Sequence, residues 1–157
     1  MEFPLPGVLE IRPSSEWVRV SASAENFWDQ SGDYNNTDSV FTAPIDGKYF
    51  FSGTGRLNDI PGNTTQYPWA RITTSNRNYR GDLIDLHNTS DTGVSLVYMS
   101  PRQYIQVTST CIADMEEGDT ADFAMRISDA TGHPDGTTDI YGHPTIMQTY
   151  WQGWLMG

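Results

Sequence analysis

The chain has 157 residues, which is enough for one domain with a core of its own. It carries 20 acidic against 9 basic residues, a formal net charge of -11. This charge argues against nucleic-acid binding through a broad basic face and against docking on anionic membranes. Its 14 Gly and 9 Pro, together with 5 Trp, 8 Tyr and 6 Phe, favour strands and turns over helices.

The first 15 residues hold three prolines and little periodicity, so we expect an extended arm with a short edge strand over residues 8–12. Residues 16–157 then form the folded domain. Free arms are normally disordered, and we hypothesise that this one attaches the domain to a neighbouring subunit or a larger assembly. The apolar residues of the arm that would make this contact are Phe3, Leu5, Val8, Leu9 and Ile11.

Alternation of apolar and polar residues, interrupted by turn residues, predicts a succession of strands. The expected strands cover 16–22, 48–57, 67–74, 83–86, 94–98, 104–115, 121–127 and 145–156. Gly53 and Gly55 lie inside one strand, where glycine marks a bulge or the close approach of another backbone. Two loops, 29–38 and 130–144, are rich in the small polar residues that form turns.

The strands differ in what their two faces carry. Residues 121–127 alternate, with Phe123 and Met125 on one face and Asp122 and Arg126 on the other, as expected for a sheet with one solvated face. Residues 48–51 and 150–155 instead carry aromatic side chains on both faces, so a second face needs a partner. We predict that these residues form the core and the contact between copies: Tyr49, Phe50, Phe51, Tyr150, Trp151 and Trp154. The alternative is a monomer whose second face is capped by the N-terminal arm.

The segment 41–51 carries a family resemblance. It reads Phe-Thr-Ala-Pro-x-x-Gly-x-Tyr-x-Phe and resembles the signature of the C1q domain, a trimeric jelly roll related to tumour necrosis factor. Asp29 and Tyr34 stand at matching upstream positions, whereas Ser23 and Gly53 depart from the aromatic residues that the signature usually has. The closing segment 150–155 is similar to the last strand of that family. The resemblance implies an all-β fold, a two-sheet antiparallel jelly-roll sandwich that is homotrimeric.

The sequence contains none of the usual catalytic motifs, such as a Gly-x-Ser-x-Gly elbow or His-Glu-x-x-His, so no enzyme is expected. Cys111, the single cysteine, is interpreted as a small buried strand residue. Four residues of one loop would suit zinc or manganese if the loop folded back on itself, and a solvated surface loop is the alternative. This speculative metal set is His133, Asp135, Asp139 and His143.

Two acidic turns have the oxygen ligands that calcium takes, although solvated turns explain them as well. The first contains Asp29, Asp33, Asn35, Asn36 and Asp38, and the second contains Asp114, Glu116, Glu117 and Asp119. Aromatic residues in or beside the expected loops could contact a glycan or a receptor. These are Tyr34, Tyr67, Trp69, Tyr79 and Tyr141.

Single domains of this kind with acidic, Asn/Thr-rich loops resemble those of bacteriophage virion proteins. The resemblance implies a non-enzymatic virion structural protein, most simply a capsid decoration or cement protein made in the host cytoplasm. The expected partners are further copies of the chain, capsid or tail proteins, and a host surface glycan, with calcium as the one cofactor considered. The alternatives are a receptor- or glycan-binding head of a tail fibre and a secreted, extracellular C1q/TNF-like binding module.

Overall fold

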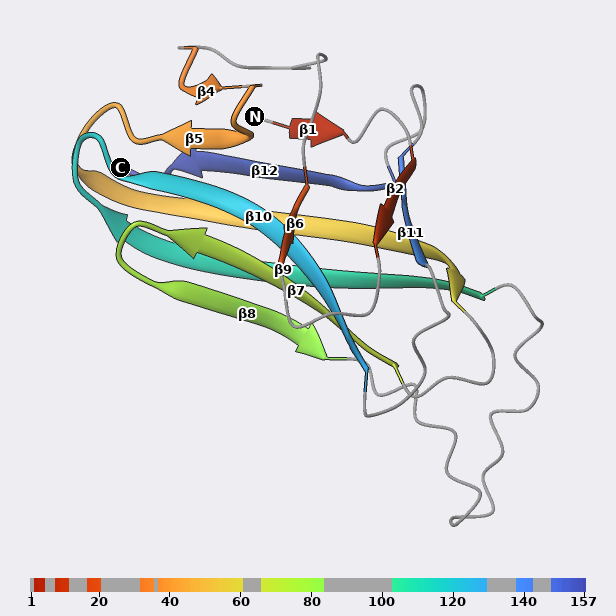
Figure 1. Cartoon of the computed structure of the whole chain (residues 1–157). Coiled ribbons are helices and arrows are strands. Elements are labelled where there is room, and N and C mark those ends of the chain that lie inside the picture. Colours follow the sequence, from red (N-terminus) through yellow and green to blue (C-terminus); the bar gives the residue numbers. More distant parts are fainter. Residues whose placement is uncertain are drawn as a thin grey trace.

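The computed structural model describes residues 2–4, 8–11, 17–20, 32–35, 37–60, 66–83, 103–129, 138–142 and 148–157. These residues form twelve strands and no helix, so none of the described segments is a helix that could cross a membrane. The strands make two antiparallel sheets, here named sheet A and sheet B (Figure 1). The expected all-β, two-sheet architecture is therefore confirmed.

Sheet A is built on the central strand β6, Gly47–Ile60. One side of β6 pairs along nearly its whole length with β9, Gln103–Met115. The other side pairs first with β12, Tyr150–Leu155, and then with β11, Thr138–Tyr141. Two short N-terminal strands extend the sheet, with β1 (Glu2–Pro4) beside β12 and β2 (Val8–Ile11) beside β11.

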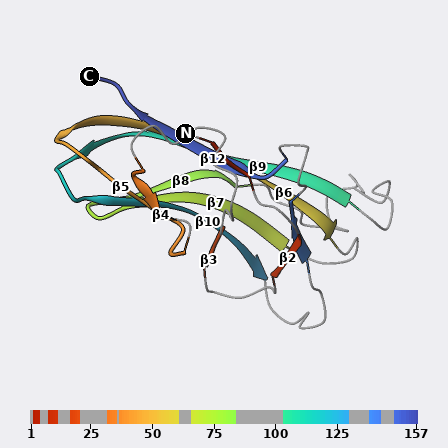
Figure 2. The ribbon, with the colours of Figure 1, turned by 90° about the horizontal axis from the view of Figure 1, so that it is seen from above.

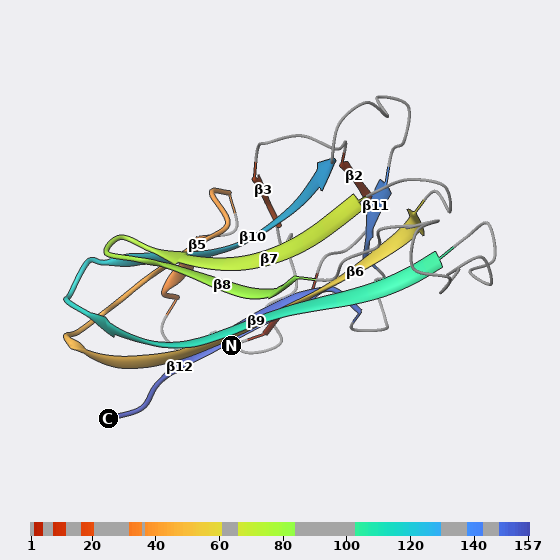
Figure 3. The same ribbon diagram turned by 90° about the horizontal axis from the view of Figure 1, so that it is seen from below.

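Sheet B is built on β10, Thr120–Asp129, which pairs with β7, Gln66–Thr74. Beyond β7 lies β8, Asn78–Leu83. On its other side β10 pairs with β5 (Val40–Thr42) and β3 (Val18–Arg19), and β5 pairs with β4 (Tyr34–Asn35). Figure 3 shows the two sheets as separate layers, joined at one end by the β5–β6 and β9–β10 turns.

The core fills the space between the layers with side chains from alternate positions of both sheets. In β6 the glycines make room, because a Cβ on Gly53 would lie 2.3 Å from the Phe123 ring and one on Gly55 would lie 2.0 Å from the Met125 sulfur. The prediction that these glycines mark a bulge or the close approach of another backbone is therefore wrong, because side chains of β10 fill the space beside them and the register with β9 is regular here. The largest fully buried side chains are Trp151, Tyr49, Phe51, Phe123, Leu57, Ile72, Met125, Ile127 and Ile140.

The two sheets come together at the edge formed by β8 and β9. A Cβ on Gly81 of β8 would lie 1.9 Å from the carbonyl oxygen of Thr108, so only glycine fits this crossing. Next to it, the buried Ser109 hydroxyl donates a hydrogen bond of 2.9 Å to the carbonyl of Tyr79. The sandwich is therefore closed on this side by direct contact between the backbones.

Several boundaries differ from those that the sequence predicts. Strand β8 begins at Asn78, before the strand predicted over 83–86, of which residues 84–86 lie outside the described residues, and β11 lies inside the loop predicted over 130–144. The edge strand predicted over 8–12 is found as β2, and β1 adds a further strand to the arm. The predicted strand 94–98 lies outside the described residues.

Candidate interaction face on sheet A

The face of sheet A that points away from the core carries a row of apolar side chains. Strand register places Trp154 of β12 opposite Phe50 of β6, and Phe50 opposite Ile112 of β9. The rings of Trp154 and Phe50 have centroids 4.3 Å apart. Trp154 is 48% exposed and Ile112 is 54% exposed, and Phe50 between them is half-buried. We call these three residues the apolar row.

Other exposed apolar side chains lie at the same end of the sandwich. Ile45 is in the β5–β6 turn, and Leu155 and Met156 follow Trp154. The N–H of Met156 donates a 2.7 Å hydrogen bond to the carbonyl of Lys48, which holds the chain end beside β6. Figure 2 shows the C-terminal end projecting beyond β12 at this end. In the part of the chain that the structure describes, all exposed large hydrophobic side chains therefore gather at one end.

The rest of this face is polar but almost neutral. Next to the apolar row, the hydroxyls of Ser52 and Thr110 lie 3.2 Å apart, and those of Thr54 and Thr108 lie 3.3 Å apart. At the other side of the row, Lys48 Nζ forms an exposed ion pair of 2.9 Å with Asp114. Copies of a chain with net charge -11 repel one another, and a face without excess negative charge is where such copies can approach.

The predicted contact residues divide between the two faces of sheet A. Tyr49, Phe51 and Trp151 lie in the core, whereas Phe50, Tyr150 and Trp154 lie on the opposite face. The prediction of aromatic residues on both faces is confirmed, and their role between copies stays a prediction. Sequence reasoning missed Ile112, although its alternation with the buried Cys111 and Ala113 signals an apolar residue on the outer face.

The two strands of the N-terminal arm that the structure describes, β1 and β2, do not cover the apolar row. Register places Phe3 of β1 opposite Trp151, and Val8, Leu9 and Ile11 of β2 opposite residues of β11. Both strands extend sheet A sideways in its own plane, and Leu5 lies outside the described residues. The segment predicted to be a separate arm is therefore, in these residues, part of the sheet of its own chain.

The described residues do not assemble any of the candidate metal sites. Asp139 lies in β11, and His133, Asp135 and His143 lie outside the described residues, as do Asp29 and Asn36 of the first acidic turn. The described residues contain no group of three or more His, Cys, Asp or Glu side chains that could hold a metal ion. In the first acidic turn the Asn35 amide group donates to Asp38 Oδ2 at 2.9 Å.

In the second acidic turn the carboxylates hold the backbone. Asp119 Oδ2 accepts hydrogen bonds from the Glu116 N–H at 2.9 Å and from the Asn76 amide at 2.7 Å. The bond from the Glu116 backbone is the main cause that lowers the pKa of Asp119 below its ordinary value. Asp46 accepts in the same way from the N–H of Glu117 at 2.7 Å. These carboxylates act as turn-forming residues.

The aromatic residues predicted beside loops belong to strands, and the described ones are partly or fully covered. Tyr34 is buried with its ring edge toward Trp151, at a centroid distance of 5.6 Å. Tyr79 packs against the core, and the Tyr141 ring lies under the guanidinium of Arg56. Trp69 is half-buried in β7, the strand that also contains Tyr67. Their prediction as exposed loop contacts is wrong for these described side chains because strand pairing turns them toward other residues.

Cys111 is buried, as predicted for a small strand residue. Its side chain faces the core from β9, and the loss of solvation raises the pKa of the thiol to about 12. The reactive form of cysteine is the thiolate, so this residue stays a neutral thiol at physiological pH.

The described strands form an all-β sandwich of two antiparallel sheets with the C1q/TNF-like jelly-roll fold. Among solved structures, the globular domain of zebrafish complement 1qA protein matches with a TM-score of 0.51 and 11% identity, over 97% of this chain and 98% of that one. Eiger TNF from S. frugiperda matches with a TM-score of 0.54 and 11% identity, over 99% of this chain and 90% of that one. No protein-family model and no curated protein matches the sequence. At this level of identity the likeness is one of fold.

Proposed function

We propose that this chain is a non-enzymatic binding module that works as a homotrimer and associates through the outer face of sheet A. The observation that carries the proposal is the apolar row, in which Trp154 and Ile112 remain about half exposed on either side of Phe50. Soluble monomers rarely leave such side chains gathered at one place.

The energetics favour covering this row. Burial of a large apolar side chain contributes on the order of 1.5–3 kcal/mol, so completing the burial of several such residues supports association. Three copies around a common axis would present the same row to one another. The C1q/TNF-like fold supports this arrangement, because the C1q domain, which segment 41–51 resembles, is a trimeric jelly roll. Absence of catalytic motifs from the sequence supports a role in binding.

A charge placed in the apolar row tests the proposal. We expect Ile112→Glu to convert the trimer to monomer, because three carboxylates would have to be buried close together. Ile112 lies on the surface of the single chain, so the variant should keep its fold by circular dichroism. The matched control is Asn78→Glu, which adds the same charge to an exposed position of β8 on sheet B. Sedimentation velocity should show a trimer for the control, and a trimer for both variants would contradict the proposal.

We further propose that the module acts on the surface of a bacteriophage particle as a decoration or cement protein. Its acidic, Asn/Thr-rich loops support this setting, and a trimer suits the threefold positions of a shell. The test is to count copies per particle and locate the protein by electron microscopy. Hundreds of copies on the capsid would support decoration, a few copies at a tail fibre would instead support a receptor-binding head, and absence from particles would contradict both.

A further inference from the structure

The outer face of sheet B carries interleaved tryptophan and arginine side chains. Alternation along β7 points Trp69 and Arg71 outward, and Arg126 of β10 and Arg80 of β8 flank them in the register. Trp17, which directly precedes β3, lies over the same face. We call these five residues the Trp–Arg ladder.

The guanidinium groups of the ladder lie against the indole rings. The Arg71 Cζ is 4.1 Å from the centre of the Trp17 ring. The Arg126 Cζ is 5.5 Å from Trp17 and 5.6 Å from Trp69, and the Arg80 Cζ is 5.4 Å from Trp69. Stacking of this kind fixes a guanidinium while its N–H groups remain available to a ligand.

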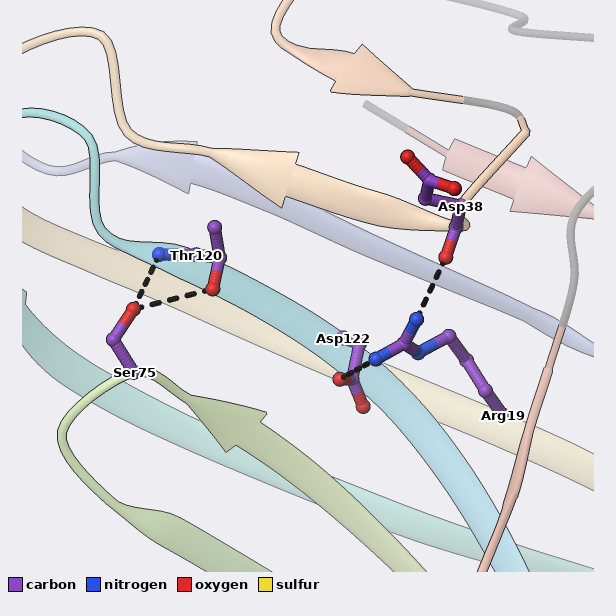
Figure 4. A network of polar contacts seen from close by, with 5 residues as sticks. All are labelled: Arg19, Asp38, Ser75, Thr120 and Asp122. Carbon is purple, nitrogen blue, oxygen red and sulfur yellow. Dashed lines mark hydrogen bonds and ion pairs between the residues drawn. The ribbon is translucent and has the colours of Figure 1, made fainter.

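The ladder concentrates positive charge in an acidic protein. Three of its members are arginines, whereas the whole chain has a net charge of -11. The nearby carboxylate of Asp122 is held by Arg19, with a 2.9 Å ion pair between Arg19 Nη2 and Asp122 Oδ2 (Figure 4). Arg19 also donates to the carbonyl of Asp38 at 2.9 Å, so it is occupied on two sides. The positive charge of the ladder is therefore not cancelled locally by Asp122 alone.

The Arg71 guanidinium contains a buried hydrogen-bond donor without an acceptor. Its Nε is buried and has no hydrogen-bond partner among the described residues, and the same holds for the hydroxyl of Thr73 two positions along β7. Loss of solvation is the main cause that lowers the pKa of Arg71; the carboxylate of Asp122 opposes this shift, and the charges of Arg80 and Arg126 add to it. A partly buried donor without an acceptor costs free energy, and an oxyanion would remove that cost.

We propose that the Trp–Arg ladder is an oxyanion-binding site, in which Arg71 binds a sulfate, phosphate or carboxylate group side-on. The Nε–H and one terminal N–H of a guanidinium match two oxygens of such a group. Arg80 and Arg126 add charge, and the Thr73 hydroxyl lies on the same face as a further donor. The site is on the sheet opposite the apolar row, so it does not depend on self-association.

The test observes the Arg71 Nε–H directly. In the intact, nitrogen-15-labelled chain, sodium sulfate is added at constant ionic strength by replacing sodium chloride, with inorganic phosphate and acetate in parallel series. We expect a saturable shift of the Arg71 Nε–H resonance, and the series with the tightest binding identifies the preferred group. Shifts that stay linear in all three series, or that are equal at Arg77 in the β7–β8 turn, would overturn the proposal.

Two variants sharpen the result. Arg71→Lys keeps the charge but removes the planar fork, and we expect it to weaken binding about tenfold. Arg77→Gln, the matched control, removes one positive charge outside the ladder and should leave the affinity within about twofold. Equal weakening by both variants would mean that only the overall charge matters, which contradicts a site built on Arg71. If Arg71→Lys fails to fold, the titration of the natural chain alone decides.

Discussion

The outer faces of the two sheets both carry tryptophan side chains but cover them to different extents. On sheet B the outward-facing tryptophans Trp17 and Trp69 are half-buried, and arginines of the same chain stack on their rings. On sheet A, Trp154 stacks on Phe50 within the apolar row and stays 48% exposed. Large aromatic side chains on a surface are stabilised by a cover, and the described residues of this chain provide one on sheet B but leave Trp154 on sheet A about half exposed.

The largest effect should separate two tryptophans of one strand. Trp151 and Trp154 both lie in β12, but Trp151 is fully buried in the core. Replacing Trp151 by Ala should lower the free energy of unfolding by about 3–5 kcal/mol, because it leaves a large cavity. Trp154→Ala leaves none and should cost clearly less. Urea unfolding at one low protein concentration measures both, and equal losses would remove the distinction between core and outer face.

The sequence predicted the centre of sheet A well because local signals agree there. Gly47 and the aromatic residues after it mark the start of β6, and the Glu117–Gly118 turn joins the two strands that the sequence predicts on either side of it. The Gly118 backbone has a φ of 89°, which glycine adopts readily. Alternation also assigned the residues of β10 correctly to their faces, with Phe123 and Met125 buried.

Other parts could not be predicted because they depend on distant residues. Strand β8 contains Arg80, Gly81 and Asp82, which do not favour strands by themselves, and its place follows from pairing with β7 and contact with β9. Strand β11 is short and lies between β6 and β2, two partners far away in the sequence. The Trp–Arg ladder likewise joins residues from separate strands, so no local sequence pattern predicts it.

A smaller effect is expected from removing the cover on sheet B. Trp17→Ala removes the ring on which the guanidinium groups of Arg71 and Arg126 stack. We expect a loss of about 1–2 kcal/mol in the free energy of unfolding, since both the stacking and the shielding of β7 disappear. Trp17→Phe keeps an aromatic face and should lose less. Thermal unfolding compares the two, and no change for Trp17→Ala would show that the ladder does not support the sheet.

The smallest effect concerns pH and the second acidic turn. Because the pKa of Asp119 is lowered in the folded chain, its contribution to stability is present above its unfolded pKa and is lost as the pH falls through the folded value. Asp119→Asn should therefore reduce the slope of stability against pH in the acid range, below the ordinary Asp pKa. Chemical unfolding measured at a series of acid pH values tests this. A variant with an unchanged slope would show that the hydrogen bonds of Asp119 do not favour its charged form.

We expect the outer face of sheet A to be completed by other copies of the chain. Light scattering of the purified natural protein across a wide concentration range tests it most directly. Self-association predicts a particle of about three times the chain mass of 17.6 kDa. A particle of 17.6 kDa that persists at high concentration would contradict it, because the apolar row would then be stable in water without a partner.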